Sequence, residues 1–241
     1  MSTRNPFFDI SLLPYQAPRF DEINDSHYRP AFDEAIRQKR ADIDAIVAQT
    51  AAPDFDNTVL ALEKSGAMLA RVSSIFFAMT SAHTNARLQE LEEQLSTELA
   101  ALANDIWLND TLFSRVESVW QDREALDAES RRLVEVTHQR FVLAGARLND
   151  AEKAELKDLN TQVASLISQF NQRLLAADKA GGLVVDYVHQ LEGLSAEEIA
   201  TAAQAAADKG LKDRWLIPLL NTTQQPALSL LRNRQTRENL F

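Results

Sequence analysis

The sequence predicts a mainly α protein, a bundle of long antiparallel helices with a small α/β insertion near the C-terminal end. Three observations lead to this prediction. The 241 residues include only six Gly and seven Pro, the residues that interrupt helices most strongly. Apolar residues recur every three or four positions over most of the first 180 residues. After Gly181-Gly182 the pattern changes to short apolar runs around one further helix.

The chain begins with an arm and a first helix. Residues 1–22 are rich in Pro and aromatic residues, so we expect an extended arm lying over the folded body. The first helix is expected over about 26–49, and Ala51-Ala52-Pro53-Asp54 ends it. Its inner side should consist of four apolar residues, Phe32, Ile36, Ile43 and Ile46.

A second helix should start near Phe55 and continue without a break through Met79, because its apolar residues keep helical spacing. Gly66 within it should permit a close contact with another helix. A third helix is expected over 85–107, and Asn109 supplies the N-cap of the next one. The following helices should cover about 111–124 and 128–147.

The longest helix should run over 150–180, a length of roughly 45 Å at 1.5 Å per residue. Its apolar seam is expected to contain seven residues, Leu156, Leu159, Val163, Leu166, Ile167, Phe170 and Leu174. Since long helices joined by short turns pack as antiparallel neighbours, we expect residues 23–180 to form the bundle. Residues 181–225 should form the small strand–helix–strand insertion, with strand character in LVVDYVHQL and RWLIPLL. From Pro226 onward, residues 226–241 are expected to form one uninterrupted helix.

Composition excludes several classes of function. The formal net charge is −10, so the chain has no general attraction for nucleic acid or for an anionic membrane. It contains no Cys, which excludes disulfides, thiolate metal sites and cysteine nucleophiles. No apolar run approaches the roughly 20 residues of a membrane span, and Pro6 and Pro14 interrupt any signal-peptide core. We therefore expect a cytoplasmic protein with neither nucleic acid nor membrane as a partner.

The four histidines, His27, His83, His138 and His189, form no local metal-binding pair, and none belongs to an H-E-x-x-H motif. Glu135 lies three residues before His138, a spacing that suits a metal-ligating or acid/base pair on one helix face. We favour the alternative, a partly buried structural histidine near a carboxylate. His27 and His83 lie close to predicted helix boundaries, where capping or solvation explains them.

Two further polar clusters have structural explanations. Four carboxylates, Glu90, Glu92, Glu93 and Glu98, alternate with Leu at helical spacing and indicate a solvated helix face. The segment NTTQQP, residues 221–226, can line a cleft and bind peptide backbone, although a turn with an N-cap also explains it. The sequence contains no G-x-S-x-G elbow, phosphate loop or dinucleotide fingerprint. We therefore assign no catalytic and no metal-binding residue, and the substrate-binding residues stay unknown.

An ordered series of motifs extends along the whole chain. The motifs are NPFF at 5–8, RFDEINDSHYRPAFDEAI at 19–36, FDNTVLALEKSG at 55–66, LNDTLFSRV at 108–116, RFVLAGARL at 140–148, LNTTQQPAL at 220–228 and NRQTRENLF at 233–241. This series resembles the thimet-oligopeptidase family of zinc metallopeptidases, and within it the peptidyl-dipeptidases, also called dipeptidyl carboxypeptidases. The resemblance implies a two-lobed, mostly helical enzyme with a deep channel, which hydrolyses short peptides and releases dipeptides from their C-terminus.

The resemblance also implies a zinc ion held by the two histidines of H-E-x-x-H and a later glutamate, with the glutamate of the motif as general base. None of these positions has a match in this sequence. We therefore expect the N-terminal lobe of such an enzyme, forming one wall of the channel, with no zinc bound and inactive alone. Short peptides and the missing C-terminal catalytic lobe would be the partners in the intact enzyme.

The final residues should then belong to a truncated helix, with Leu240 and Phe241 directed at the missing lobe. Two other interpretations stay open. One is a complete, non-catalytic helical module that binds peptides or a protein partner. The other is a metal enzyme whose scattered His and Glu residues come together on folding. A reading frame that continues past Phe241 to H-E-x-x-H would favour the N-terminal lobe of a zinc peptidase, and an immediate stop codon would favour the module.

Overall fold

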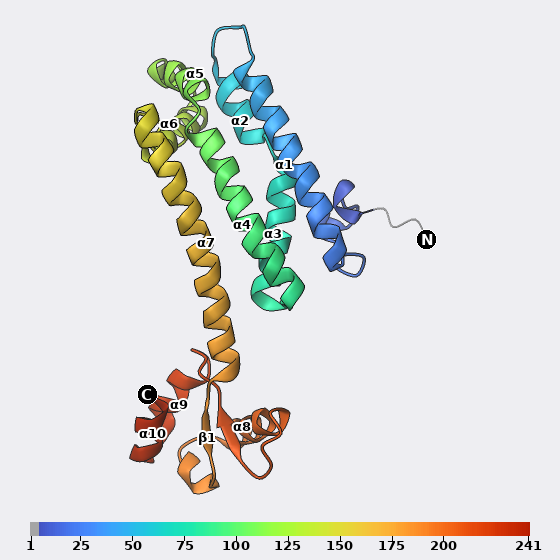
Figure 1. Ribbon diagram of the computed structural model, residues 1–241, viewed down its shortest axis with the longest axis vertical. Coiled ribbons are helices and arrows are strands. Elements are labelled where there is room, and N and C mark those ends of the chain that lie inside the picture. The colour runs from blue at the N-terminus through green and yellow to red at the C-terminus, as the bar shows by residue number, and fades with distance from the viewer. Residues whose placement is uncertain (1–4) are drawn as a thin grey trace. The chain divides into compact units, whose positions relative to one another are not determined.

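The structure is a computed structural model that describes residues 5–241, apart from the side chain of Lys179. Residues 1–4 of the expected arm lie outside the described residues. The chain is mainly helical and contains a two-stranded antiparallel sheet, which confirms the predicted fold class (Figure 1). Contacts between residues divide it into two compact units, of which the first ends at Ser168 and the second covers Gln169–Phe241.

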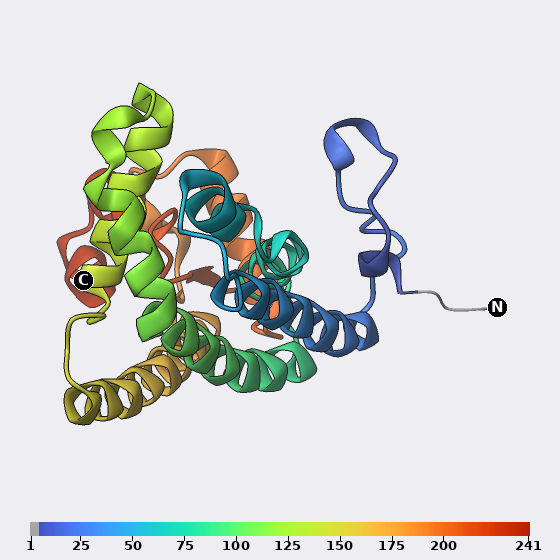
Figure 2. The same cartoon turned by 90° about the horizontal axis from the view of Figure 1, so that it is seen from above.

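The first unit is a bundle of helices joined by short turns. Its helices are α1 (Asp25–Val47), α2 (Ala61–Lys64), α3 (Ala67–Ala82), α4 (Ala86–Trp107), α5 (Asp110–Gln121), α6 (Ala128–Leu143) and the first part of α7 (Asp150–Ala180). Helix α1 packs against α3 and α4, and α5 packs against α6 (Figures 1 and 2). These contacts are those of the predicted helical bundle.

Local capping signals set the starts of most of these helices. The Oδ1 atoms of Asn85 and Asn109 accept the backbone N–H groups of Leu88 and Leu112, which have no partner inside the helix. Asp127 caps α6 in the same way. Because these signals are local, the predicted starts of α4, α5 and α6 agree with the structure to within about one residue.

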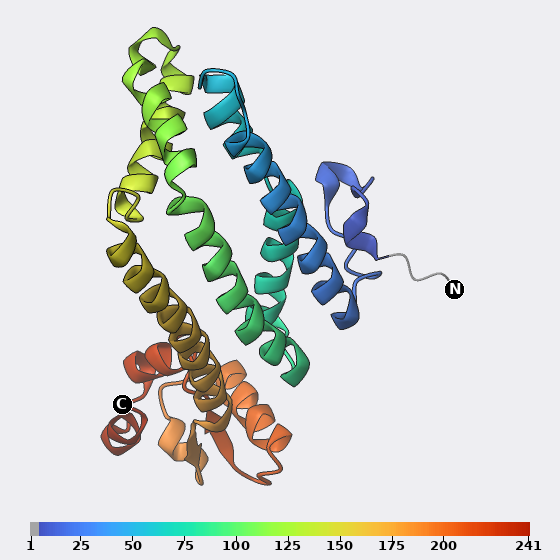
Figure 3. The same cartoon turned by 45° about the horizontal axis from the view of Figure 1, so that its top comes forward.

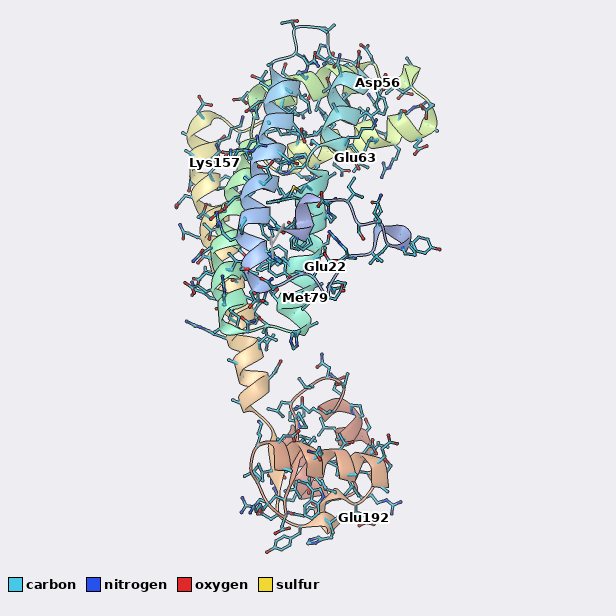
Figure 4. All side chains as sticks on the ribbon, turned by 90° about the vertical axis from the view of Figure 1, so that its right-hand side faces the viewer. Glu22, Asp56, Glu63, Met79, Lys157 and Glu192 are labelled. Carbon is cyan, nitrogen blue, oxygen red and sulfur yellow. The ribbon has the colours of Figure 1, made fainter. Side chains whose placement is uncertain are left out.

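The first unit has two main buried clusters. One surrounds Phe32 and Phe76, whose rings meet edge to face with their centroids 5.4 Å apart. The other surrounds Leu112 and Phe141, where α5 and α6 meet α1 and α4. In Figure 4, Met79 lies toward one end of this unit and Asp56 toward the other. The predicted inner side of α1 is confirmed, since Phe32, Ile43 and Ile46 are buried and Ile36 is half-buried.

The N-terminal segment lies beside α1 (Figure 3). It contains short 3-10 turns at Pro6–Phe8 and Pro14–Gln16. Phe7 is buried against the ring of Tyr28, and the Arg71 side chain donates a hydrogen bond to the Phe7 carbonyl (3.0 Å). The first turn is therefore anchored in the bundle core.

The predicted second helix is interrupted, so the expectation of a continuous helix was wrong. A π-helical turn at Phe55–Leu60 and α2 lead to Ser65, which is extended, and α3 begins after Gly66. Gly66 has φ +72°, and its N–H donates to Oδ2 of Asp42 on α1 (3.0 Å). An added Cβ at Gly66 would lie 2.6 Å from Cδ of Lys39. Gly66 thus does permit a close approach to α1, but as a turn residue in the left-handed region.

Helix α6 ends at Leu143, earlier than expected. Gly145 adopts φ +96°, its N–H donates to the Val142 carbonyl, and the Ala146 N–H donates to the Phe141 carbonyl. These two bonds form a Schellman cap, which ends the helix at the glycine that the sequence analysis did not use.

The second unit contains β1 (Leu183–Val185), α8 (Ala196–Asp208), β2 (Trp215–Ile217), α9 (Gln224–Leu230) and α10 (Arg234–Leu240), after the last part of α7. Strands β1 and β2 are antiparallel, with Leu183 opposite Ile217 and Val185 opposite Trp215. Both strands are shorter than expected, because a 3-10 turn at Val188–Leu191 follows β1 and Pro218 follows β2.

The expected uninterrupted helix after Pro226 is also corrected. The structure has two helices, because Leu231 departs from the helical conformation (φ −58°, ψ 128°) and Asn233 caps α10 by accepting the Thr236 N–H (3.0 Å). Leu240 is only 2% exposed and packs in the core of this unit, whereas Phe241 is 97% exposed. Leu240 therefore does not face outward as expected.

The predicted seam of α7 is not a buried seam. Leu156 is half-buried, and the other six residues are exposed, namely Leu159, Val163, Leu166, Ile167, Phe170 and Leu174. These apolar residues do recur at helical spacing along α7, but six of the seven side chains are exposed at the surface of the described chain. Across residues 5–241, no helix combines the length and the apolar character that crossing a bilayer requires.

Candidate functional site

A cavity of about 260 Å³ in the second unit lies between α8, β2 and the segment before α9. Leu216 and Ile217, both buried, contribute to its apolar floor. Its polar rim consists of two carboxylates and three hydroxyl groups: Glu197, Glu198, Thr201, Thr222 and Thr223. The NTTQQP segment therefore does line a cavity.

Local hydrogen bonds hold this rim. Oε2 of Glu198 accepts the backbone N–H of Ser195 (2.7 Å), and Oγ of Ser195 accepts the N–H of Glu198, a capping box that starts α8. The backbone and side-chain hydrogen bonds from Ser195 lower the pKa of Glu198 below its ordinary value. Oγ1 of Thr223 donates to the Pro218 carbonyl (2.5 Å) and accepts the Leu220 N–H (3.3 Å), which closes the turn before α9.

The cavity offers acceptors, hydroxyl donors and negative charge around an apolar floor. This combination suits a small ligand group with an apolar stem and a cationic or amide end. The described lining residues include no imidazole, thiol or cationic side chain. Peptide binding by the NTTQQP segment stays a prediction.

His138 does not pair with Glu135. Its Nε2 atom lies 2.9 Å from Oε2 of Glu117 on α5, and its ring stacks on Trp120 at 4.5 Å between centroids. Glu135 pairs instead with Arg132 on its own helix (3.2 Å). With only 7% of its surface exposed, His138 joins α5 to α6 and is closed to a ligand.

Glu117 has basic side chains on two sides, since Arg147 lies 3.5 Å from its Oε1 atom and His138 lies beside its Oε2 atom. Burial alone would raise the pKa of Glu117. The hydrogen bond and charge of His138, together with those of Arg147, outweigh that effect and lower the pKa. The sequence analysis missed Glu117 because 21 residues and a turn separate it from His138.

The other histidines have separate surroundings. Nδ1 of His27 lies 3.3 Å from the backbone nitrogen of Asn24 and takes part in the cap of α1, as expected for a residue at a helix boundary. His83 is exposed directly after α3. The ring of His189 stacks on the ring of Tyr187 in the second unit, with 5.7 Å between their centroids. Within residues 5–241 as described, no group of three or more His, Asp or Glu side chains is placed to hold a metal ion.

The four glutamates of α4 divide into two pairs. Glu90 and Glu93 are exposed, as expected for a solvated face. Glu92 accepts a hydrogen bond from Thr80 (3.1 Å), and Glu98 accepts two from Arg29 (2.6 and 3.0 Å). The second pair therefore links α4 to α3 and α1.

Comparison with known proteins gives extensive similarity to peptidases. The dipeptidyl carboxypeptidase of Salmonella typhimurium is 68% identical over 243 residues, which cover 100% of this chain and 36% of that protein. The dipeptidyl carboxypeptidase of Escherichia coli is 65% identical with the same coverage. Oligopeptidase A of Haemophilus influenzae is 24% identical over 245 residues, again across the whole chain and 35% of that protein.

No protein-family profile matches the chain. The chain spans about a third of the length of the curated relatives that it matches. The ordered motifs of the sequence analysis thus extend over the same 241 residues that these relatives share.

Proposed function

Because the chain belongs to the family of the dipeptidyl carboxypeptidases and oligopeptidases A, as an N-terminal portion, we propose that it is part of a zinc peptidase. This peptidase would act in the cytoplasm on short peptides and release dipeptides from their C-terminus. The observation that carries the proposal is the 68% identity to the Salmonella typhimurium protein over the whole chain. In the proposal, this chain forms one wall of the substrate channel, and the remaining part of the polypeptide supplies the catalytic site.

We place the zinc ion of the proposed peptidase in that remaining part. The chemistry of the residues described here supports this, because they do not fit a zinc site. A catalytic zinc ion needs three protein ligands and one open position. Residues 5–241, as described, provide no such group of His, Asp and Glu side chains. His138, the most buried of the histidines, is already bonded to Glu117 and covered by Trp120.

The test compares three proteins on an N-blocked tetrapeptide, with product release followed by chromatography. The first is the 241-residue chain, with and without added zinc. The second is a fusion of this chain to the remaining part of the Salmonella typhimurium protein. The third is the intact Salmonella typhimurium protein as the positive control. We expect no cleavage by the chain alone, and release of C-terminal dipeptides by the fusion that stops on addition of a zinc chelator.

Two results would contradict the proposal. Zinc-dependent dipeptide release by the 241-residue chain would place catalytic residues within it. An inactive fusion beside an active Salmonella typhimurium control would show that this chain cannot serve as the peptidase portion. Peptide binding by the chain in the absence of any activity of the fusion would support the non-catalytic module.

A further inference from the structure

The longest helix of the chain carries an exposed apolar stripe. Six large apolar residues of α7 are at least 49% exposed: Leu159, Val163, Leu166, Ile167, Phe170 and Leu174. At about 100° per residue, all six lie within an arc of about 100° on one side of the helix. We call these six residues the α7 stripe. An apolar stripe of this width is the kind of surface that a helix normally buries against a partner.

The side of α7 opposite the stripe is the one that lies inward. Thr161, Ala164 and Ser165 are half-buried and Ser168 is buried, although these residues are small or polar. Nearer its start, α7 contacts α4 through polar groups, where Asn160 donates to Oδ1 of Asn104 (2.7 Å). Over residues 159–168, which belong to the first unit, the helix therefore buries its less apolar side and leaves its apolar side exposed, the reverse of what burial of the stripe within that unit would give.

The charges of α7 give independent support. No Asp, Glu, Lys or Arg occurs from Leu159 to Gln172, in a chain of which 25% of the residues are charged. Lys157, labelled in Figure 4, and Asp158 lie just before this stretch, and Arg173 follows it. Depletion of charged residues distinguishes the centre of a protein interface from ordinary surface. A helix face that stays in contact with water normally carries charged residues, so exposure to water does not explain this depletion.

We propose that the α7 stripe is the surface on which the remaining part of the peptidase polypeptide packs. This inference rests on the proposed function and names the contact surface between its two parts. We infer this partner from the length of the Salmonella typhimurium relative. About two thirds of that protein lies outside the part that matches this chain. A second copy of the chain fits less well, because it would bring together two chains that each carry a formal charge of −10.

The experiment uses the isolated chain and the fusion to the remaining part of the Salmonella typhimurium protein. The stripe variant is the double substitution Leu166→Gln and Phe170→Gln, at positions that are 62% and 65% exposed. The control is Leu143→Gln at the end of α6, an exposed leucine outside the stripe. Each substitution is made in both proteins. Urea unfolding, hydrogen exchange and binding of a hydrophobic dye are measured.

The stripe variant should leave the unfolding midpoint of the isolated chain almost unchanged and reduce its dye binding. In the fusion, the same variant should clearly lower the unfolding midpoint, because it then places two amides in a buried interface. The amides of residues 159–175 should exchange more slowly in the unmodified fusion than in the chain, by roughly tenfold or more. The control substitution should change the unfolding midpoint by the same small amount in both proteins.

The proposal is overturned if the fusion tolerates the stripe variant as well as the chain does, or if exchange over residues 159–175 is equally fast in both. It is also overturned if the isolated chain forms a dimer that the stripe variant dissociates while the fusion is insensitive, since a second copy would then be the occupant. Peptidase activity distinguishes the two proposals. An active fusion that is insensitive to the variant refutes the surface only, and an inactive fusion that is sensitive to it refutes the function only.

Discussion

Nε2 of His138 on α6 lies 2.9 Å from Oε2 of Glu117 on α5, so one side-chain contact fastens these two helices together. Trp120 covers one face of the imidazole, and Arg147 lies near the other oxygen of the carboxylate. Charge-assisted hydrogen bonds of this kind are stronger than those between neutral groups. The contact should therefore contribute measurably to the packing of α6 on α5.

Glu117→Gln should lower the free energy of unfolding at pH 7 by about 1–2 kcal/mol, since the amide keeps the shape but removes the charge. The pKa of Glu117 is lowered in the folded protein from its ordinary value of 4.5. A carboxylate with a lowered folded pKa stabilises the protein above its ordinary pKa and loses that effect as the pH falls through the folded value. The difference between wild type and variant should therefore shrink as urea titrations move from pH 7 to below pH 4.5.

The matched control for this prediction is Glu135→Gln. Glu135 pairs with Arg132 on the surface of the same helix, and such pairs contribute only about 0–1 kcal/mol. If Glu117→Gln loses no more stability than Glu135→Gln, or if its loss of stability does not depend on pH, the contact with His138 adds nothing to stability.

Arg115 on α5 is 7% exposed and holds the segment between α1 and α2. Its guanidinium donates to the carbonyls of Gln49 (3.1 Å) and Ala51 (3.3 Å) and to Oδ1 of Asn57 (2.8 Å). Arg115→Ala leaves these three acceptors without that donor and should lower the free energy of unfolding by about 2–4 kcal/mol. Hydrogen exchange over residues 49–57 should accelerate more than exchange over α4.

Two further variants make this prediction specific. The free energy of unfolding of Arg115→Lys should lie between those of wild type and Arg115→Ala, because one ammonium group cannot span three acceptors as a planar guanidinium does. Arg132→Ala, at a side chain that is 70% exposed, should change stability by less than about 0.5 kcal/mol. An Arg115→Ala variant as stable as Arg132→Ala would mean that the segment holds its conformation without the buried cation.

Sequence predicted the parts of the fold that depend on neighbouring residues. The capping side chains of Asn85 and Asn109 lie within three residues of the N–H groups that they satisfy, so the starts of α4 and α5 could be read directly. The break at Gly66 was missed because apolar spacing continues through it. Its conformation depends on Asp42, 24 residues earlier in the chain.

In the candidate sites too, contacts between residues far apart in the sequence could not be predicted. The spacing of His138 and Glu135 on one helix suggested a pair, but the actual partner of His138 comes from the neighbouring helix. For α7, amphipathic spacing correctly identified an apolar stripe, yet spacing alone does not say what covers it. Partners across helices and partners outside the chain both depend on tertiary structure, which local periodicity does not encode.

Two glycines in the left-handed region allow backbone strain to be separated from crowding. Gly66 (φ +72°) and Gly210 (φ +74°) have similar conformations, but an added Cβ at Gly210 would meet nothing within 4 Å. Gly210→Ala should therefore cost only the strain of the left-handed conformation, about 1–2 kcal/mol. Gly66→Ala should cost more, because its Cβ displaces the Lys39 side chain, whose Nζ atom is bonded to the Ser65 hydroxyl (2.5 Å). Urea unfolding of both variants measures the difference, and equal losses would refute the crowding argument.

Adjacent phenylalanines near the N-terminus provide the last comparison. Phe7 is 2% exposed and its ring centroid lies 5.4 Å from that of Tyr28, whereas Phe8 is 46% exposed. Phe7→Ala should lower the free energy of unfolding by about 3–5 kcal/mol, the usual range for a buried phenylalanine, and Phe8→Ala by less than half as much. Because Phe7 anchors the segment beside α1, its variant should also be cleaved faster by a protease within residues 9–22 under native conditions. If the two variants lose equal stability and are cleaved at equal rates, Phe7 does not hold the N-terminal segment on the bundle.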